Sequence, residues 1–310
     1  MSELRPRRRW IIDDILIFLK TIFPFFNFFS DRYKLLLYFF FKNERYKNKY
    51  LKNIHKNKSC YILGNGLSAS DLDIKKLNSS YVFACNEIFY HKQYKDLKID
   101  YYTIIEPFYG RIMGKKYIED ILRLYSETSI AFKNKKTTLF FNTSLKYFFK
   151  KHKLFKNNKV RFVIPLNKSK KQNIPLNNLD GEFNFGGGAF NFMIASAIYM
   201  GFKNIYLIGC GYTYSPRQHF HFYARPSYLK SKYSYKSMLK KANKDAFDKG
   251  LSIKSIDESK DHYLPIFISL YKNDHIKKSQ IEINEFAKKM NVKIINIVPN
   301  EYKSPVFNRN

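Results

Sequence analysis

Polar side chains stand directly after three short apolar runs of this sequence. Asn65 lies between Gly64 and Gly66, Asn86 follows a run that ends in cysteine, and Glu106 follows a run that ends in two isoleucines. If these runs are parallel strands, their polar followers lie at the carboxyl edge of one sheet, where open α/β sheets bind ligands. Asparagine amides can hydrogen-bond a base or a ribose, while backbone N–H groups hold phosphate. The spacing therefore predicts a nucleotide pocket, although each residue alone could equally be a capping residue.

Two glycine-rich turns are candidates for the phosphate contacts. The first, Gly64–Gly66, leads from a strand-like run toward a helix that Ser68 or Ser70 can cap. A strand that passes through glycines into a helix presents free N–H groups, which suit phosphate. A lone Gly-x-Gly is weak evidence, because an ordinary strand-to-loop turn has the same pattern. The second turn, Gly186–Gly188, opens an apolar helix and could be a second anion site or a plain loop before a packed helix.

Histidines are the candidates for a general base, because the imidazole pKa lies near neutral pH. His219 and His221 lie in a long loop rich in Tyr, Ser and Arg, whereas His275 precedes a predicted helix. A ring at a helix start can project towards the strand ends. No metal is predicted, since His-x-His without a nearby Cys, Asp or Glu partner is poor ligand spacing.

The elements that position these residues alternate between short strands and helices from residue 58 onward. This alternation predicts an α/β fold, a single Rossmann-like and mostly parallel sheet with helices on both faces and a lid-like loop region. We expect strands at 60–63, 81–85, 101–105, 129–133, 138–142, 160–164, 204–209 and 293–297, and helices at 71–77, 115–127, 144–150, 188–201, 235–249 and 276–290.

Charge and the first 55 residues distinguish this chain further. The 310 residues carry 56 Lys and Arg against 25 Asp and Glu, a net charge of +31, which indicates an anionic partner or a general lysine bias. Residues 1–55 combine basic clusters with aromatic runs that Asp and Lys interrupt, so they favour helices on a membrane surface over a spanning helix. A helical cover or an oligomer contact is the alternative. The three cysteines stand in apolar runs and predict buried thiols in a reducing compartment: Cys60, Cys85 and Cys210.

The order of these motifs resembles the bacterial lipooligosaccharide sialyltransferases over roughly residues 58–302. That family has Gly-Asn-Gly-Pro-Ser, Cys-Asn and Asn-Pro after its first three strands, where this chain has 64–68, 85–86 and 106–107. The family's later helix, strand and Gly-x-Asp-x-Tyr turn match 201–214. Its catalytic histidine falls on His275.

The resemblance implies a role for each candidate. Asn65 and its glycines would hold the nucleotide phosphate and ribose, Asn86 and Glu106 would orient the donor, and His275 would take the proton from the acceptor hydroxyl. The leaving phosphate would be stabilised by two tyrosines, Tyr212 and Tyr214.

Some positions depart from the family pattern. Glu106 replaces Asn, Gly188 and Ala189 replace a Thr-Ser pair that touches the donor, and Gly211 replaces Asp, so Gly187, Gly188, Ala189 and Gly211 enter as donor-site candidates by position. The His-Phe-His loop is similar to a wider group, the hydroxymethylpterin pyrophosphokinases and the glycosyltransferase-like domains of flagellin modification. His219 and His221 are therefore rivals of His275.

Together these observations predict a two-part chain, with a basic and aromatic helical extension at 1–55 and a nucleotide-sugar-binding glycosyltransferase domain at 56–310. The expected reaction is metal-independent transfer of a sugar, such as sialic acid or a related acidic sugar from a CMP donor, to a glycan or glycolipid of the bacterial surface. No cofactor besides the donor and no nucleic acid is expected. We expect a peripheral protein on the cytoplasmic face of the inner membrane, and a homo-oligomer is left open. The alternatives are an ATP-dependent pyrophosphokinase-like enzyme and a non-enzymatic basic membrane-binding protein.

Overall fold

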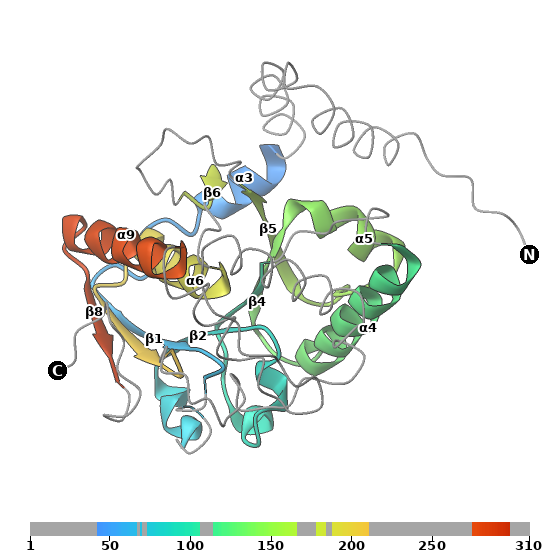
Figure 1. Cartoon of the computed structure of the whole chain (residues 1–310), viewed down its shortest axis with the longest axis horizontal. Coiled ribbons are helices and arrows are strands. Elements are labelled where there is room, and N and C mark those ends of the chain that lie inside the picture. The colour runs from blue at the N-terminus through green and yellow to red at the C-terminus, as the bar shows by residue number, and fades with distance from the viewer. Residues whose placement is uncertain are drawn as a thin grey trace, which may run out of the picture.

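The structure, a computed structural model, describes residues 42–66, 69, 73–105, 114–165, 178–183, 188–210 and 275–297. These residues form a single sheet with helices on both faces (Figure 1). The strand order is β6-β5-β4-β3-β2-β1-β7-β8, and every described pairing is parallel. The strands are β1 Ser59–Leu63, β2 Tyr81–Cys85, β3 Tyr101–Ile104, β4 Thr138–Asn142, β5 Lys159–Pro165, β6 Glu182–Phe183, β7 Asn204–Ile208 and β8 Lys293–Asn296.

Alternate residues of each strand face opposite sides, so the sheet has a core on each face. Cys60 and Ile62 of β1 pack in one core beneath α6 and α9, whereas Leu63 packs in the other with Val82 and Ala84 of β2. That second core includes residues of α4, α5 and η3. The helices are α3 Lys42–Lys49, α4 Gly114–Phe132, α5 Lys146–Lys151, α6 Gly188–Tyr199 and α9 His275–Lys289, with 3₁₀ turns η3 Ile74–Ser79, η4 Ile88–Tyr90, η5 Tyr94–Asp96 and η7 Thr143–Leu145.

The predicted parallel α/β sheet is confirmed, but one predicted strand is wrong. Residues 129–133 fall mostly in the last turn of α4, where Phe132 is fully buried and Ile130 is 74% exposed. Residues two apart lie on the same face of a strand but on opposite sides of a helix, so this contrast fits the helix. A short apolar run does not separate the two states by composition. The predicted helix at 71–77 is the 3₁₀ turn η3, and the predicted helix at 235–249 lies outside the described residues.

The segment from Lys42 to His55 packs on the sheet domain, although the sequence places it in the extension. In α3, the Asn48 side chain donates from Nδ2 to the carbonyl oxygens of Phe162 (2.8 Å) and Leu179 (2.9 Å). The described chain from Lys42 onward therefore packs on the sheet, as the helical-cover alternative expects, and the predicted division into 1–55 and 56–310 stays a prediction. Residues 1–41, which carry most of the predicted membrane segment, lie outside the described residues. Among the helices that are described, none has the length and apolar character needed to cross a membrane.

Candidate functional site

The strand order reverses between β1 and β7, which makes this the switch point of the sheet. From β1, the strands β2 to β6 follow on one side, and the chain then returns through α6 to place β7 and β8 on the other. Open α/β sheets bind ligands in the crevice beyond the carboxyl ends of the strands at such a point. The predicted glycine turn, Gly64–Gly66, lies at this place, directly after β1.

The glycines of this turn allow two strand ends to lie against each other. Gly64 donates its N–H to the carbonyl oxygen of Ile208, and Gly66 donates to that of Gly209, both at 2.8 Å. A Cβ on Gly64 would lie 2.5 Å from the Gly209 oxygen, and one on Gly66 would lie 2.6 Å from it. The expectation that these two N–H groups are free for phosphate therefore needs correction, because each already has a carbonyl acceptor. A role for the turn in lining the donor site stays a prediction.

The structure brings Asn65 and Asn86 to the same edge. Asn65 is only 5% exposed, and its Nδ2 donates to the carbonyl oxygen of Cys85 at 3.1 Å, which ties the end of β1 to the end of β2. Asn86 is half-buried and has a φ of +50°, a left-handed conformation that asparagine tolerates better than most residues. Its N–H donates to the Thr103 oxygen (2.9 Å), and its carbonyl accepts from the Tyr102 hydroxyl (2.5 Å). Two amide side chains therefore lie at adjoining strand ends whose backbone is held by hydrogen bonds.

Two helices direct their N-termini to the same edge. The helix α6 begins at Gly188 and leads into β7, and α9 begins at His275 and leads into β8. A helix that returns the chain to the next parallel strand runs opposite to that strand, so its N-terminus lies toward the carboxyl edge. The helix α6 also packs against α9 (Figure 1). Helix N-termini carry a partial positive charge, which favours an anion nearby.

The predicted helix starts at residues 188 and 276 are thus matched within one residue. Gly188 has a φ of +72°, so glycine is used there for its backbone conformation, and Ala189 follows in the first turn. The backbone places His275 at the helix start, where the sequence expects the base. Its role as base stays a prediction.

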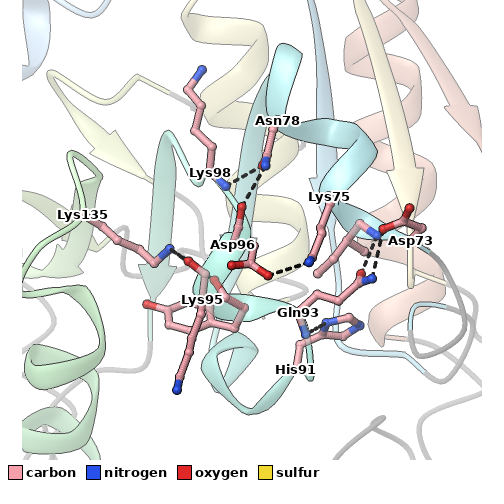
Figure 2. A network of polar contacts seen from close by, with 11 residues as sticks. Asp73, Lys75, Asn78, His91, Gln93, Lys95, Asp96, Lys98 and Lys135 are labelled. Carbon is pink, nitrogen blue, oxygen red and sulfur yellow. Dashed lines mark hydrogen bonds and ion pairs between the residues drawn. The ribbon is translucent and has the colours of Figure 1, made fainter.

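A polar network holds the connection that follows the glycine turn (Figure 2). His91 Nδ1 accepts from the N–H of Gln93 at 3.1 Å, so the neutral ring carries its proton on Nε2, which donates to the Ala69 oxygen at 3.2 Å. Gln93 Oε1 accepts from the N–H of Ile74 (2.9 Å), and its Nε2 donates to Asp73 Oδ1 (3.0 Å). Burial lowers the pKa of His91. Sequence reasoning missed both residues, because no motif marks the distant contacts of a single His and Gln.

The thiols are not candidates for nucleophilic chemistry. Cys60, Cys85 and Cys210 are buried and free, as the sequence predicts. Burial raises the pKa of Cys60 and Cys85 well above the ordinary thiol value, and that of Cys210 to about 12. Such thiols stay protonated at neutral pH and are poor nucleophiles.

Several predicted site residues lie outside the described part of the chain, and their roles stay predictions. They are Ser68, Glu106, Gly187, Gly211, Tyr212, Tyr214, His219 and His221. Within the described ranges, no cluster of three or more His, Cys, Asp or Glu side chains could hold a metal ion.

Neither a protein-family model nor a curated protein matches this chain. Solved structures do match. The monofunctional α-2,3-sialyltransferase Cst-I of Campylobacter jejuni is 14% identical, with 82% of this chain and 80% of that chain covered and a TM-score of 0.43. The sialyltransferase CstII of the same organism, in complex with cytidine-5'-monophosphate, is 14% identical, with 82% and 85% covered and a TM-score of 0.39.

A third match is the MAf glycosyltransferase of Magnetospirillum magneticum. It is 14% identical, with 57% of this chain and 28% of that chain covered and a TM-score of 0.35. At such identities, and with TM-scores below 0.5, these three matches establish neither membership of a family nor an activity.

Proposed function

We propose that this chain is a glycosyltransferase that uses a nucleotide-activated sugar as its donor. The observation that carries the proposal is the edge at the switch point between β1 and β7. Two asparagine side chains, Asn65 and Asn86, lie there at adjoining strand ends, and the N-termini of α6 and α9 are directed to the same edge. Amides can read a base or ribose, and a helix N-terminus favours the phosphates of the donor.

The existing hydrogen bonds and the burial at this edge indicate which groups are the better candidates to contact the donor. The N–H groups of Gly64 and Gly66 are used between strands, so the start of α6 at Gly188 is the better candidate for a phosphate contact. Asn86 is half-buried at the edge and is the better candidate for a direct contact with the donor than the deeply buried Asn65. In this account Asn65 acts on the donor mainly by fixing the ends of β1 and β2.

For the chemical step, we propose that His275 removes the proton from the acceptor hydroxyl as that oxygen attacks the anomeric carbon of the donor sugar. The bond from the anomeric carbon to the donor phosphate breaks, and the nucleotide leaves with the electron pair. Tyr212 and Tyr214 would donate hydrogen bonds to the leaving phosphate, the task that metal ions perform in other transferases. The donor we propose is CMP-linked and acidic, and the acceptor is a glycan or glycolipid. These finer assignments rest on the resemblance of the motifs.

A donor screen tests the proposal. In one assay, the melting temperature of the full chain is measured with CMP, UDP, GDP or ATP, each with and without EDTA. In a second assay, unheated protein is incubated with the corresponding nucleotide sugars and glycan acceptors, and sugar transfer is measured. We expect CMP to raise the melting temperature, since a ligand at 100 times its Kd stabilises the fold by about 2.7 kcal/mol. We expect transfer from a CMP-sugar that EDTA does not abolish. Binding of ATP alone, with a magnesium-dependent transfer of pyrophosphate, would instead assign the chain to the pyrophosphokinase-like alternative.

A further inference from the structure

The helix α3 is fixed on the domain by one side only. Glu44 forms an ion pair with Lys146, and Asn48 donates from its side chain to two carbonyl oxygens, those of Phe162 and Leu179. Glu44 and Asn48 are buried, and they lie four residues apart on the inward face of the helix. Arg45 also donates from Nε to the carbonyl oxygen of Asp180 at 2.7 Å. Because several contacts hold the inward side of α3, the opposite face is presented in a defined orientation.

The outward face of α3 and the residue directly after this helix carry an exposed aromatic pair. Tyr46 is 60% exposed and Tyr50 is 61% exposed. Their rings meet edge to face with centroids 5.0 Å apart, and the Tyr50 hydroxyl donates to that of Tyr46. Ile54, in the turn after the helix, is 44% exposed.

The charged side chains of residues 42–58 are almost all basic. Glu44 is the only acidic residue between 42 and 58, and it is buried against Lys146. The positive charge of the stretch is therefore not compensated by an acidic neighbour in the sequence. Its lysines are all exposed: Lys42, Lys47, Lys49, Lys52, Lys56 and Lys58.

We propose that this α3 surface, defined as the exposed residues of 42–58, docks on an anionic lipid bilayer. Tyrosine prefers the boundary between headgroups and acyl chains, where the ring is buried and the hydroxyl stays wet. Lysines beside it lay their aliphatic stems on apolar surface and pair their ammonium groups with anionic headgroups. A single-stranded nucleic acid fits less well, because it stacks its bases on open aromatic faces, and the edge-to-face pair of Tyr46 and Tyr50 covers part of that area. The proposal does not depend on the reaction proposed for the sheet edge.

Local tryptophan probes test the docking in the full chain. Trp10 is the sole tryptophan, so a Trp10→Phe background is dark. Tyr46→Trp and Tyr50→Trp are made in that background, with Met290→Trp as the matched control. Met290 is 53% exposed but follows α9 at the β8 edge, the opposite edge of the sheet from α3. Vesicles of phosphatidylcholine are compared with vesicles that also contain phosphatidylglycerol.

We expect the anionic vesicles to shift the emission of both α3 probes to shorter wavelength and brominated lipid to quench them, while the probe at position 290 stays unchanged. If the chain binds the vesicles but neither α3 probe responds, another segment makes the contact and the proposal is overturned. The same probes are also titrated with single-stranded RNA. The proposal fails if the chain does not bind the anionic vesicles, or if RNA changes the emission of the α3 probes and the vesicles do not.

Charge variants distinguish a local contact from a general effect of net charge. Lys42→Gln combined with Lys49→Gln removes two charges from the α3 surface, and Lys288→Gln combined with Lys289→Gln removes two exposed charges near the far edge. Each lysine near an anionic surface contributes about 1 kcal/mol, which corresponds to about a fivefold change in partitioning. We expect the α3 variant to sediment with vesicles at least about tenfold more weakly than the control variant. Equal losses in the two variants would contradict the proposal.

Discussion

Replacing Asn86 with glycine removes a single amide from the candidate site while leaving the backbone unstrained. Asn86 has a φ of +50°, which glycine adopts freely, whereas alanine would add strain. The backbone contacts of this residue, its N–H to Thr103 and its carbonyl to the Tyr102 hydroxyl, do not involve the side chain. Asn86→Gly should therefore change the free energy of unfolding by no more than about 1 kcal/mol.

The effect on the nucleotide should be larger than the effect on the fold. If the amide makes one or two hydrogen bonds to the donor, each contributes about 0.5–1.5 kcal/mol, and nucleotide binding weakens by about 2- to 150-fold. Isothermal titration with CMP measures the Kd, and urea denaturation measures the stability. The matched control is Asn291→Gly, since Asn291 is also left-handed, with a φ of +53°, but is exposed after α9.

The two variants together test whether the Asn86 amide binds the donor nucleotide. We expect Asn86→Gly to lose nucleotide affinity and Asn291→Gly to keep it. An unchanged Kd in Asn86→Gly, with an unchanged urea midpoint, would refute the assignment of this amide to the donor.

Three further outcomes are expected. His275→Ala should lower turnover by about 10²–10⁴-fold with the donor Kd kept, the usual cost of losing a general base, and near wild-type turnover would move the base to the His-Phe-His loop. Gly66→Ala should lower the free energy of unfolding, measured by urea denaturation, by about 1–3 kcal/mol, because its Cβ would lie 2.6 Å from a carbonyl oxygen at the end of β7. The control is Gly181→Ala, because no atom lies closer than 3.4 Å to its added Cβ, and equal urea midpoints in the two variants would contradict the packing. The free energy of unfolding should also fall as the pH drops below about 6.5, because burial lowers the pKa of His55 and His91 in the folded state. As the pH falls, the unfolded chain therefore binds protons at these histidines before the folded chain does, which favours unfolding. A urea midpoint at pH 5.5 equal to that at pH 7.5 would contradict this.

Sequence patterns predict the sheet well because its strands are buried on both faces. The runs that became β1, β2 and β7 are continuous and apolar, which is typical of parallel strands. Once those runs are strands, their polar followers must share one edge, so the juxtaposition of Asn65 with the end of β2 could be predicted. The helix start at Gly188 follows from the long apolar run after the glycines, and that at His275 from the amphipathic pattern of the segment after it.

Contacts between distant segments could not be predicted in the same way. Nothing local shows that the N–H groups of Gly64 and Gly66 donate to the end of β7, because this depends on the distance between two strand ends. The sequence left a helical cover open as an alternative but could not show how α3 is anchored, since Asn48 binds carbonyl oxygens with its amide and the helix has little apolar stripe. His91 and Gln93 were missed for a similar reason, as their partners lie about 20 residues earlier in the chain.

The most direct test of the central claim is a crystal structure of the full chain with the nucleotide that stabilises it best in the donor screen. We expect nucleotide density beyond the carboxyl ends of β1 and β2, with the Asn86 amide within hydrogen-bonding distance of the base or ribose and a phosphate near the start of α6. Nucleotide bound at the amino edge of the sheet, or at a surface away from the switch point between β1 and β7, would contradict it.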